Sequence, residues 1–215
     1  MPSRRESKQS KFSHLERLVL MCAMLVCIDP EFIEPCLPCV TMFPPSGEAW
    51  LHEIKHPGQR LIARRGERGV RLFGGCGEDW TSAFPFLVES MNLLPVRSCI
   101  IDGDLVRCDA HGKPWLDPLL DGQLETGASL YAFDLLEVNG FDLRREPIED
   151  RKRALTRLLR KPPGAIRLSA SLGRGGQPLL QEVSQMGFDG IISKRRGSRY
   201  LSGRSPDWLF SRKMP

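Results

Sequence analysis

Residues 50–60 read Trp-Leu-His-Glu-Ile-Lys-His-Pro-Gly-Gln-Arg (WLHEIKHPGQR). The run from Trp50 to Lys55 alternates in the manner of a half-buried β-strand, and Pro57 and Gly58 then interrupt it. A lysine at the end of such a strand is either a solvated residue or a nucleophile that points into a pocket. The rest of the sequence has to decide between these two interpretations.

Short strand patterns with occasional helices continue along the chain. A hairpin is expected at Gly66–Gly69. The expected strands are Trp50–Lys55, Arg60–Arg65, Gly69–Phe73, Ser98–Asp102, Asp104–Cys108, Leu130–Asp134 and Ala165–Leu168. The expected helices are Phe84–Asn92 after a Thr81/Ser82 cap, Ile148–Arg160, and Pro178–Met186 with Gly187 as its C-cap. The proline-rich residues 31–49 predict an extended lead-in. This order predicts an α+β fold with antiparallel sheets flanked by helices.

The composition is that of a globular protein with a mild positive charge. The chain has 215 residues, 41% of them hydrophobic, and a formal net charge of +5. Basic residues concentrate at 194–213 and at 151–161, the second group on an expected helix. Such clusters suit a phosphate-rich partner, but taken alone they favour a solvated surface.

The N-terminal residues and the cysteines give weaker signals. The apolar run Leu18–Ile28 is too short to span a bilayer, and no small-residue cleavage site follows it. We therefore expect residues 1–30 to form an extension that is helical or loosely ordered. The seven cysteines include one CxxC, Cys36–Cys39, without a second pair at zinc-finger spacing. Reduced thiols are favoured over a metal site.

The order of motifs along the chain carries the strongest signal. The motifs are Lys55–Gly58, Asp102–Asp104, Tyr131–Asp134, Asp189–Lys194 and Asp207–Leu209. Supporting stretches are Phe32–Pro38, Asp79–Thr81, Phe133–Leu136, Arg151–Lys152 and Ser202–Ser205. This series resembles the covalent nucleotidyltransferases, most closely the bacterial ATP-dependent DNA ligases of the ligase D type. The resemblance covers about residues 31–213 and implies that residues 31–215 form a DNA ligase adenylation domain.

The resemblance also implies a reaction. A lysine attacks the α-phosphate of ATP to form lysyl-AMP, and Mg²⁺ (or Mn²⁺) neutralises the phosphates. By resemblance the nucleophile is Lys55, and Asp104 and Asp189 bind the metal or the ribose. Phe133 stacks on the base opposite Ile191 or Ile192, and Lys194 contacts the α-phosphate. The implied nucleotide-binding set is Glu53, Ile54, Arg60, Asp104, Phe133, Ile192, Lys194 and Arg212.

The sequence departs from the family pattern at several of these motifs. Pro57 replaces the aspartate of K-x-D-G, and Gly75 stands where an arginine is usual. Asp104 and Asp189 are each one methylene shorter than the family's glutamates. Phe210 and Arg212 replace the two lysines of W-x-K-x-K. Family members continue into an OB-fold domain, and we expect this chain to lack one.

Three functions remain open at this point. The first is an ATP-dependent DNA ligase of DNA repair and recombination that acts on nicked or broken DNA. It would be a monomer, would work with end-joining repair proteins in the bacterial cytoplasm and nucleoid, and would not bind a membrane. The second is a catalytically impaired, truncated remnant that only binds nucleotide or DNA. The third, weaker, is an RNA ligase or capping guanylyltransferase. Labelling by ATP or GTP separates them.

Overall fold

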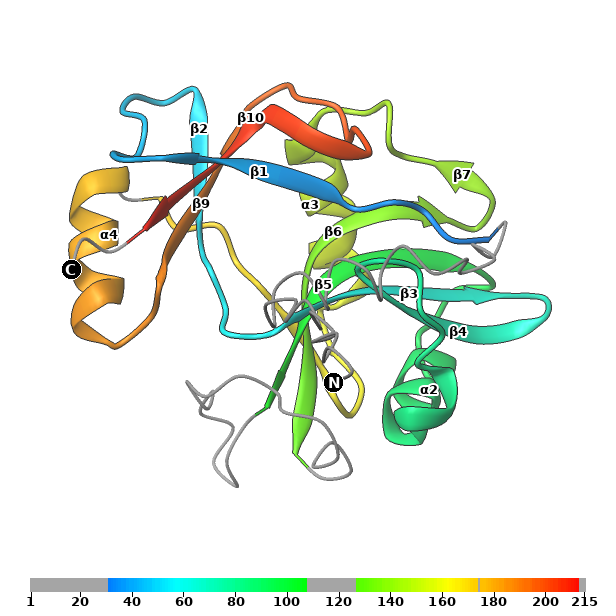
Figure 1. Cartoon of the computed structure of the whole chain (residues 1–215). Coiled ribbons are helices and arrows are strands. Elements are labelled where there is room, and N and C mark those ends of the chain that lie inside the picture. Colours follow the sequence, from blue (N-terminus) through cyan, green and yellow to red (C-terminus); the bar gives the residue numbers. More distant parts are fainter. Residues whose placement is uncertain (1–30, 108–126, 174, 213–215) are drawn as a thin grey trace, which may run out of the picture.

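Two β-sheets form the centre of the computed structural model, which describes residues 31–107, 127–173 and 175–212 (Figure 1). The first sheet has the strand order β1-β10-β9-β2. The second has the order β4-β3-β5-β6-β7, and β8 also pairs with β6. The strands are β1 (Cys36–Thr41), β2 (Trp50–Ile54), β3 (Gln59–Gly66), β4 (Gly69–Gly74), β5 (Cys99–Arg107), β6 (Ala128–Val138), β7 (Phe141–Asp142), β8 (Ile166–Leu168), β9 (Gly190–Arg195) and β10 (Gly203–Arg212).

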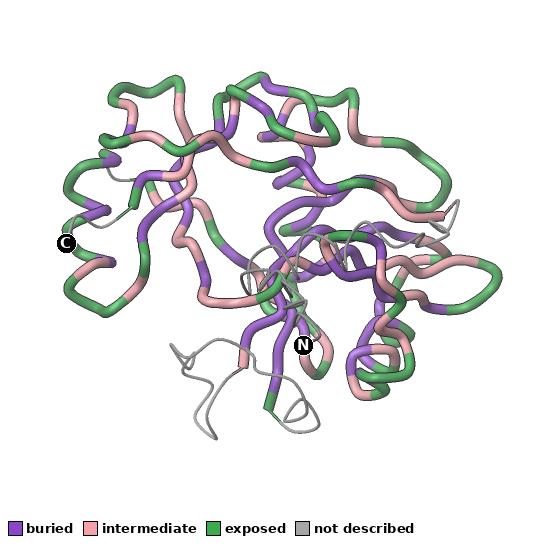
Figure 2. Tube along the Cα trace, viewed as in Figure 1, coloured by how far each residue is buried: buried purple, intermediate pink, exposed green. Residues whose placement is uncertain are grey.

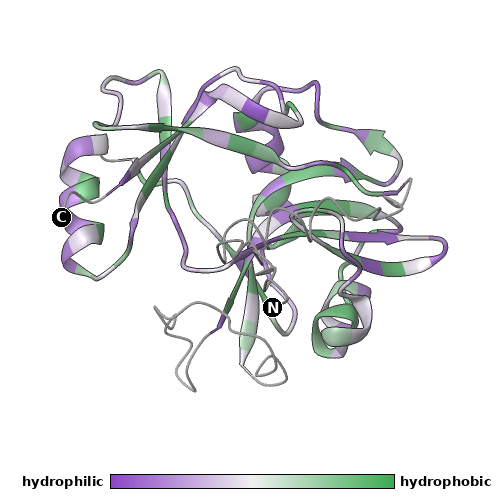
Figure 3. Cartoon of the chain, in the orientation of Figure 1, coloured by the Kyte–Doolittle hydropathy of each residue, from purple (hydrophilic) through white to green (hydrophobic). Residues whose placement is uncertain are grey.

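The helices lie outside the sheets. They are the 3₁₀ helix η1 (Thr81–Ala83), α2 (Pro85–Asn92), α3 (Ile148–Leu158) and α4 (Gly176–Gln185). α2 and α3 contribute to the main hydrophobic core, which is built on one face of the six-stranded sheet. α4 packs on β9 through Leu179, Leu180 and Val183, which contact Ile191. Figure 3 shows hydrophobic and hydrophilic residues mixed along α4, as expected for a helix with one buried side.

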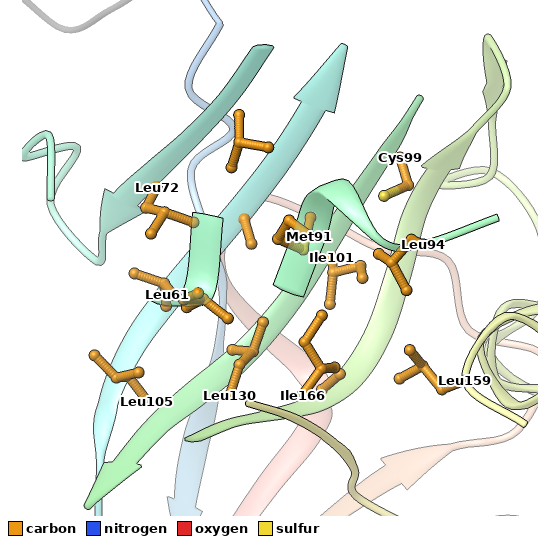
Figure 4. Close-up of a cluster of buried hydrophobic side chains, with 14 of the residues drawn as sticks. Leu61, Leu72, Met91, Leu94, Cys99, Ile101, Leu105, Leu130, Leu159 and Ile166 are labelled. Atoms are coloured by element: carbon orange, nitrogen blue, oxygen red, sulfur yellow. The ribbon is translucent and has the colours of Figure 1, made fainter. Parts of the chain in front are cut away.

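The main core follows from the two-residue period of the strands. Leu61 and Ala63 of β3 face the helices, whereas Ile62 faces the opposite side of the sheet. Figure 4 shows part of the helix-side cluster, with Leu61, Ile101 and Leu130 beside Met91 of α2. Figure 2 shows how continuously β5 and β6 are buried. These two strands therefore form a rigid base for any side chain that they present.

A second core fills the space between the two sheets. It combines Ile62 and Phe133 from the six-stranded sheet with Cys36 and Trp208 from the four-stranded sheet. Tyr200, between β9 and β10, belongs to the same cluster. The two sheets therefore meet through aromatic side chains, and residues at this junction are held from both sides.

Most of the expected elements are confirmed, with four corrections. The sheets include two parallel pairs, β1 with β10 and β6 with β8. The residues around Gly103 form one strand, β5, because a register shift lets the chain continue past the glycine. Thr81 belongs to η1 and does not cap α2, whose cap residue Phe84 makes no side-chain hydrogen bond. Arg151 and Lys152 are buried and do not belong to a solvated helix face.

Candidate functional site

Lys55 lies at the end of β2, where the chain leaves the four-stranded sheet. Its backbone N–H donates to the carbonyl of Gly190, the first residue of β9, at 3.0 Å. Its Nζ donates to Asp104 Oδ2 at 2.8 Å and to the carbonyl of His56 at 2.6 Å. Its side chain keeps 30% of its surface exposed, so the ammonium is held against a carboxylate and still reachable from solvent. This arrangement favours a pocket lysine over a solvated strand end.

The glycine three residues after Lys55 has a steric reason. A Cβ on Gly58 would contact the backbone carbonyl of Leu105 in β5 and come within 2.9 Å of Val106 Cγ2. Because a backbone carbonyl cannot swing away as a side chain does, only glycine allows this close approach. The glycine therefore lets the chain cross from β2 to β3, which brings Lys55 next to Asp104.

Glu53 lies two residues before Lys55 and is buried between two lysines. Its Oε1 accepts from Lys152 Nζ at 2.6 Å, and its Oε2 accepts from Lys194 Nζ at 2.9 Å. Burial by itself raises the pKa of a carboxyl group, but the two ammonium groups outweigh it and lower the pKa of Glu53. Burial also lowers the pKa of Lys194, which is 1% exposed. The site therefore contains a buried carboxylate held between two ammonium groups.

Two aromatic rings form the apolar wall beside this carboxylate. Phe133 of β6 and Trp208 of β10 meet edge to face, with centroids 6.1 Å apart. Lys194 Nζ lies 4.2 Å from the Phe133 centroid and 4.0 Å from that of Trp208. The guanidinium of Arg60 lies 4.6 Å from the Phe133 centroid. Two cations therefore lie over the Phe133 ring, within the distance at which a cation and an aromatic face attract each other.

Arg60 is fixed by a buried carboxylate. Its Nε and Nη2 both donate to Asp102 at 2.5 Å, and Nη2 also donates to the carbonyl of Cys36. The hydroxyl of Tyr200 donates to Asp102 Oδ2 at 2.6 Å and accepts from the N–H of Cys36 at 3.0 Å. The motif arginine is therefore oriented by a network that joins β1, β3 and β5.

A cavity of about 50 Å³ lies among these groups. Pockets for drug-sized ligands usually measure about 300–1,000 Å³, so side chains must move before ATP could enter. A larger, open hollow of about 670 Å³ lies near β3 and β4, but none of the catalytic, nucleotide-binding or metal-binding residues implied by the resemblance line it. Eight of those residues line the small cavity: Glu53, Ile54, Lys55, Arg60, Asp104, Phe133, Ile192 and Lys194.

The two remaining residues of the expected site lie outside the cavity lining. Asp189 is exposed and directly precedes Gly190, whose carbonyl accepts from Lys55. Arg212 is exposed at the end of β10 and pairs in register with Gly190 of β9. Both therefore lie at the same end of the four-stranded sheet as Lys55. Their expected roles toward metal and nucleotide stay predictions.

Sequence reasoning missed several residues that complete the site. Lys152 was part of a charge run attributed to the surface, and its partner Glu53 lies 99 positions away. The motif pattern assigns a role to Asp104 and none to Asp102, although the alternation of a strand places the two on the same face. Trp208 belongs to the last motif, and the pattern does not indicate that it lines the cavity. The signal that could have identified Asp102 is the need of a buried arginine, here Arg60, for a carboxylate partner.

The family of the chain follows from comparison with known proteins. The model of the ATP dependent DNA ligase domain matches residues 38–210, which contain every residue that lines the small cavity. The chain belongs to this ATP-dependent DNA ligase family. It is 37% identical over 185 residues to the multifunctional non-homologous end joining protein LigD of Pseudomonas aeruginosa, covering 84% of this chain and 22% of that protein.

Solved structures of ligase D give the same assignment. The ligase domain of LigD from M. tuberculosis matches with a TM-score of 0.72 at 26% identity, covering 84% of this chain and 60% of that one. A mycobacterial DNA ligase D complexed with ATP and MES matches with a TM-score of 0.71 at 27% identity and the same coverage. The expected α+β nucleotidyltransferase fold is confirmed. The chain is an ATP-dependent DNA ligase adenylation domain homologous to the LigD ligase domain.

The ligase relatives are much longer than this chain. It spans about a fifth of the length of the LigD proteins that it matches. In the described ranges, no helix has the length and apolar character needed to cross a membrane. The same ranges contain no group of three or more His, Cys, Asp or Glu side chains that could hold a metal ion by themselves.

Proposed function

We propose that this chain transfers AMP from ATP to Lys55 as the first step of joining DNA nicks or breaks. One observation carries the proposal: the Lys55 ammonium is paired with Asp104 at the edge of a cavity lined by Glu53, Phe133 and Lys194. A nucleophilic amine, a carboxylate, an aromatic face and a second ammonium are the groups that nucleotidyl transfer requires.

The transfer has a simple atom balance. The neutral amine of Lys55 attacks the α-phosphorus, a P–N bond forms, and the bond to the bridging oxygen breaks, releasing pyrophosphate. The amine must lose a proton, and Asp104 Oδ2, 2.8 Å from Nζ, is the nearest carboxylate oxygen that accepts from it. Lys55 is therefore held in place before the nucleotide arrives, and its pairing with Asp104 has to loosen for attack.

The donor set near Lys55 fits Mg²⁺ in the manner usual for nucleotide enzymes. Mg²⁺ is commonly bound by one or two carboxylates together with substrate phosphates and water, without a cage built only from protein. Asp104 provides such a carboxylate beside Lys55, and we assign Asp189 as a second candidate because it precedes the residue that Lys55 contacts. The bound ion would neutralise phosphate charge. Arg60, Lys194 and Arg212 are proposed to bind the nucleotide.

The wider biological role is part of the same proposal. The first relatives are named for non-homologous end joining, and we propose DNA with a nick or break as the substrate. We also propose that the chain is a monomer, that it acts together with end-joining repair proteins, and that it works in the cytoplasm near the nucleoid. We further propose that residues 31–215 form the adenylation domain and residues 1–30 an extension to it.

The test is covalent labelling with α-³²P-ATP and Mg²⁺. We expect acid-labile labelling of the wild type and none in Lys55→Ala or Lys55→Arg. Arg153→Met is the matched control, because Arg153 is exposed on α3, where it pairs with the exposed Asp150. A wild type that remains unlabelled across divalent metals and pH, or a Lys55→Ala variant that is labelled, would refute the proposal.

A second function is favoured by two observations. The cavity is small in this state, and Pro57 and Phe210 remove polar groups that the family supplies. A chain that binds DNA or nucleotide without forming the adenylate would bind nicked duplex in a salt-sensitive manner. Fluorescence anisotropy across salt concentrations, measured beside the labelling assay, separates the two: binding without label supports the second function.

A further inference from the structure

Lys152 of α3 is buried with every donor in use. Its Nζ donates to Glu53 Oε1 at 2.6 Å, to the carbonyl of Phe133 at 3.2 Å and to the carbonyl of Ser169 at 3.2 Å. A lysine ammonium has three N–H donors and no acceptor. Lys152 therefore has no donor left for a nucleotide, and any role that it has in the reaction must act through its partners.

Those partners come from different parts of the fold. Glu53 belongs to β2 of the four-stranded sheet, whereas Phe133 belongs to β6 of the six-stranded sheet and Ser169 follows β8. Lys152 therefore fixes the carboxylate of Glu53 relative to the strand that carries the Phe133 ring. Both side chains line the small cavity, and Lys152 is not among its lining residues.

The Glu53 carboxylate retains acceptor capacity after both lysines have bound. Two carboxylate oxygens offer about four lone-pair sites, and Lys152 and Lys194 take one on each oxygen. The remaining sites can accept an N–H from a ligand. Adenine presents an exocyclic amine, which donates, whereas guanine presents a carbonyl oxygen at the same position, which only accepts. A carboxylate oxygen held opposite the 6-position of the base would therefore favour adenine, whose amine donates to it, over guanine, whose carbonyl there cannot.

We propose that Lys152 is the positioning residue for base selection: it holds the Glu53 carboxylate and the Phe133 strand in register so that ATP binds in preference to GTP. This proposal rests on the adenylation function proposed above. It assigns a role in the recognition of the base to a helix residue that does not line the cavity.

The charges around Glu53 provide a specific signature of this role. The titratable groups that face it are Lys152 from α3, Lys194 from β9 and His56 after β2, and Asp134 of β6 acts on Lys194. Burial lowers the pKa of His56, so this group is neutral near pH 7. Removing Lys152 leaves one ammonium against the burial of the carboxyl group, so the pKa of Glu53 rises. ATP binding by the variant then weakens as the pH falls.

The experiment compares Lys152→Met, Lys152→Gln and Lys152→Arg with the wild type and with Arg153→Met. Self-adenylation is followed with α-³²P-ATP and α-³²P-GTP from about pH 8 to pH 6. This range lies above the usual pKa of a glutamate side chain. For Lys152→Met and Lys152→Gln we expect a rise of about 10–100-fold in the KM for ATP, the value of one charge-assisted hydrogen bond. The ATP-to-GTP preference should fall about as much, and the maximal rate less than threefold.

The control and the conservative variant make the result specific. Arg153→Met should behave as the wild type, and Lys152→Arg should recover part of the ATP preference. The KM of both neutral variants should rise further toward pH 6, whereas that of the wild type should not. Equal losses with ATP and GTP that are independent of pH, or a wild-type preference in Lys152→Gln, would overturn the proposal.

Failure of the proposed function gives a different pattern. If the wild type is not labelled, the same variants are compared by equilibrium binding of ATP and GTP in calorimetry. A wild type that prefers ATP, with a preference that is lost in Lys152→Gln, then supports Lys152 as the positioning residue without catalysis. A preference unchanged in the variants, or no preference in the wild type, rejects it.

Discussion

Replacing Arg151 by methionine tests whether the buried ion pair of α3 holds the domain together. Arg151 and Asp134 both have fully buried side chains, and two parallel bonds of 2.8 and 2.9 Å join them. Arg151 also donates to the carbonyls of Glu146 and Ser198 at 2.7 and 3.0 Å. The substitution leaves an ionised carboxylate and two carbonyls inside the protein without these donors.

The expected cost is large because the charge that remains cannot reach water. Removing one partner of a buried pair costs about 3–5 kcal/mol in free energy of unfolding. For a domain of this size that corresponds to a fall of about 6–20 °C in Tm. Arg153→Met, which changes the next residue on the exposed side of α3, should remain within about 0.5 kcal/mol of the wild type.

Urea unfolding followed by circular dichroism measures these differences. The double variant Arg151→Met/Asp134→Leu removes the isolated charge together with its partner, so it should recover most of the loss. It also covers the case in which the single variant does not fold. A single variant that loses less than about 1 kcal/mol, or a double variant no more stable than the single one, would refute the reasoning.

Three further predictions concern residues that support the candidate site. Burial lowers the pKa of His56 from 6.5 to about 4, so the unfolded chain binds the proton first as the pH falls. The free energy of unfolding should therefore be unaffected by His56 above about pH 6.5 and fall by about 3 kcal/mol between there and pH 4. In His56→Phe, the free energy of unfolding measured with urea should fall less steeply over this pH range. Gly58→Ala forces a Cβ against the carbonyl of Leu105 and should lower stability by about 1–3 kcal/mol in thermal melts. Tyr200→Phe deprives Asp102 of a donor and a backbone N–H of its acceptor, so it should cost about 1–3 kcal/mol in urea unfolding.

The helices and the antiparallel strands could be predicted because their signals are local. α3 begins directly after Pro147, and Ile148 and Leu155, two helical turns apart, lie on its buried face. Gly187 adopts a positive φ of 91° just after α4, as a glycine C-cap requires. The hairpin ends at Gly69, whose φ of 98° suits a glycine turn. In each case the residues that form the structure lie within one or two turns of the chain.

The elements that escaped prediction depend on distant partners. The prolines of residues 31–49 predict an extended lead-in but no strand pairing; β1, which contains Pro38, is an edge strand and therefore tolerates a proline. The pairing of β1 with β10 is shifted between Pro38 and Cys39, which no local pattern signals. Likewise, Lys152 of α3 can be buried because Glu53 of β2 pairs with it, and nothing near residue 152 indicates that partner.

The lining of the cavity illustrates what the order of motifs can and cannot predict. It supplied residues such as Lys55, Glu53 and Phe133, which the structure brings together around one space. It contains Asp102 and Lys152 but does not indicate that they hold Arg60 and Glu53 in place. The motifs mark the groups that line the cavity, whereas the groups that support them follow from packing, and packing depends on the whole chain.

The strand order β1-β10-β9-β2 has a consequence for how the protein is made. β10 lies between β1 and β9, so a strand from the start of the described chain finds its neighbour only after residues 203–212 have been synthesised. During synthesis up to that point, Cys36–Thr41 has no strand with which to pair. The later pairing of β1 with β10 closes a very long loop. The six-stranded sheet draws on residues 59–168 and is available earlier. A nascent chain arrested before β10 should therefore protect β3, β5 and β6 from protease while leaving β1 open to cleavage and to capture by chaperones.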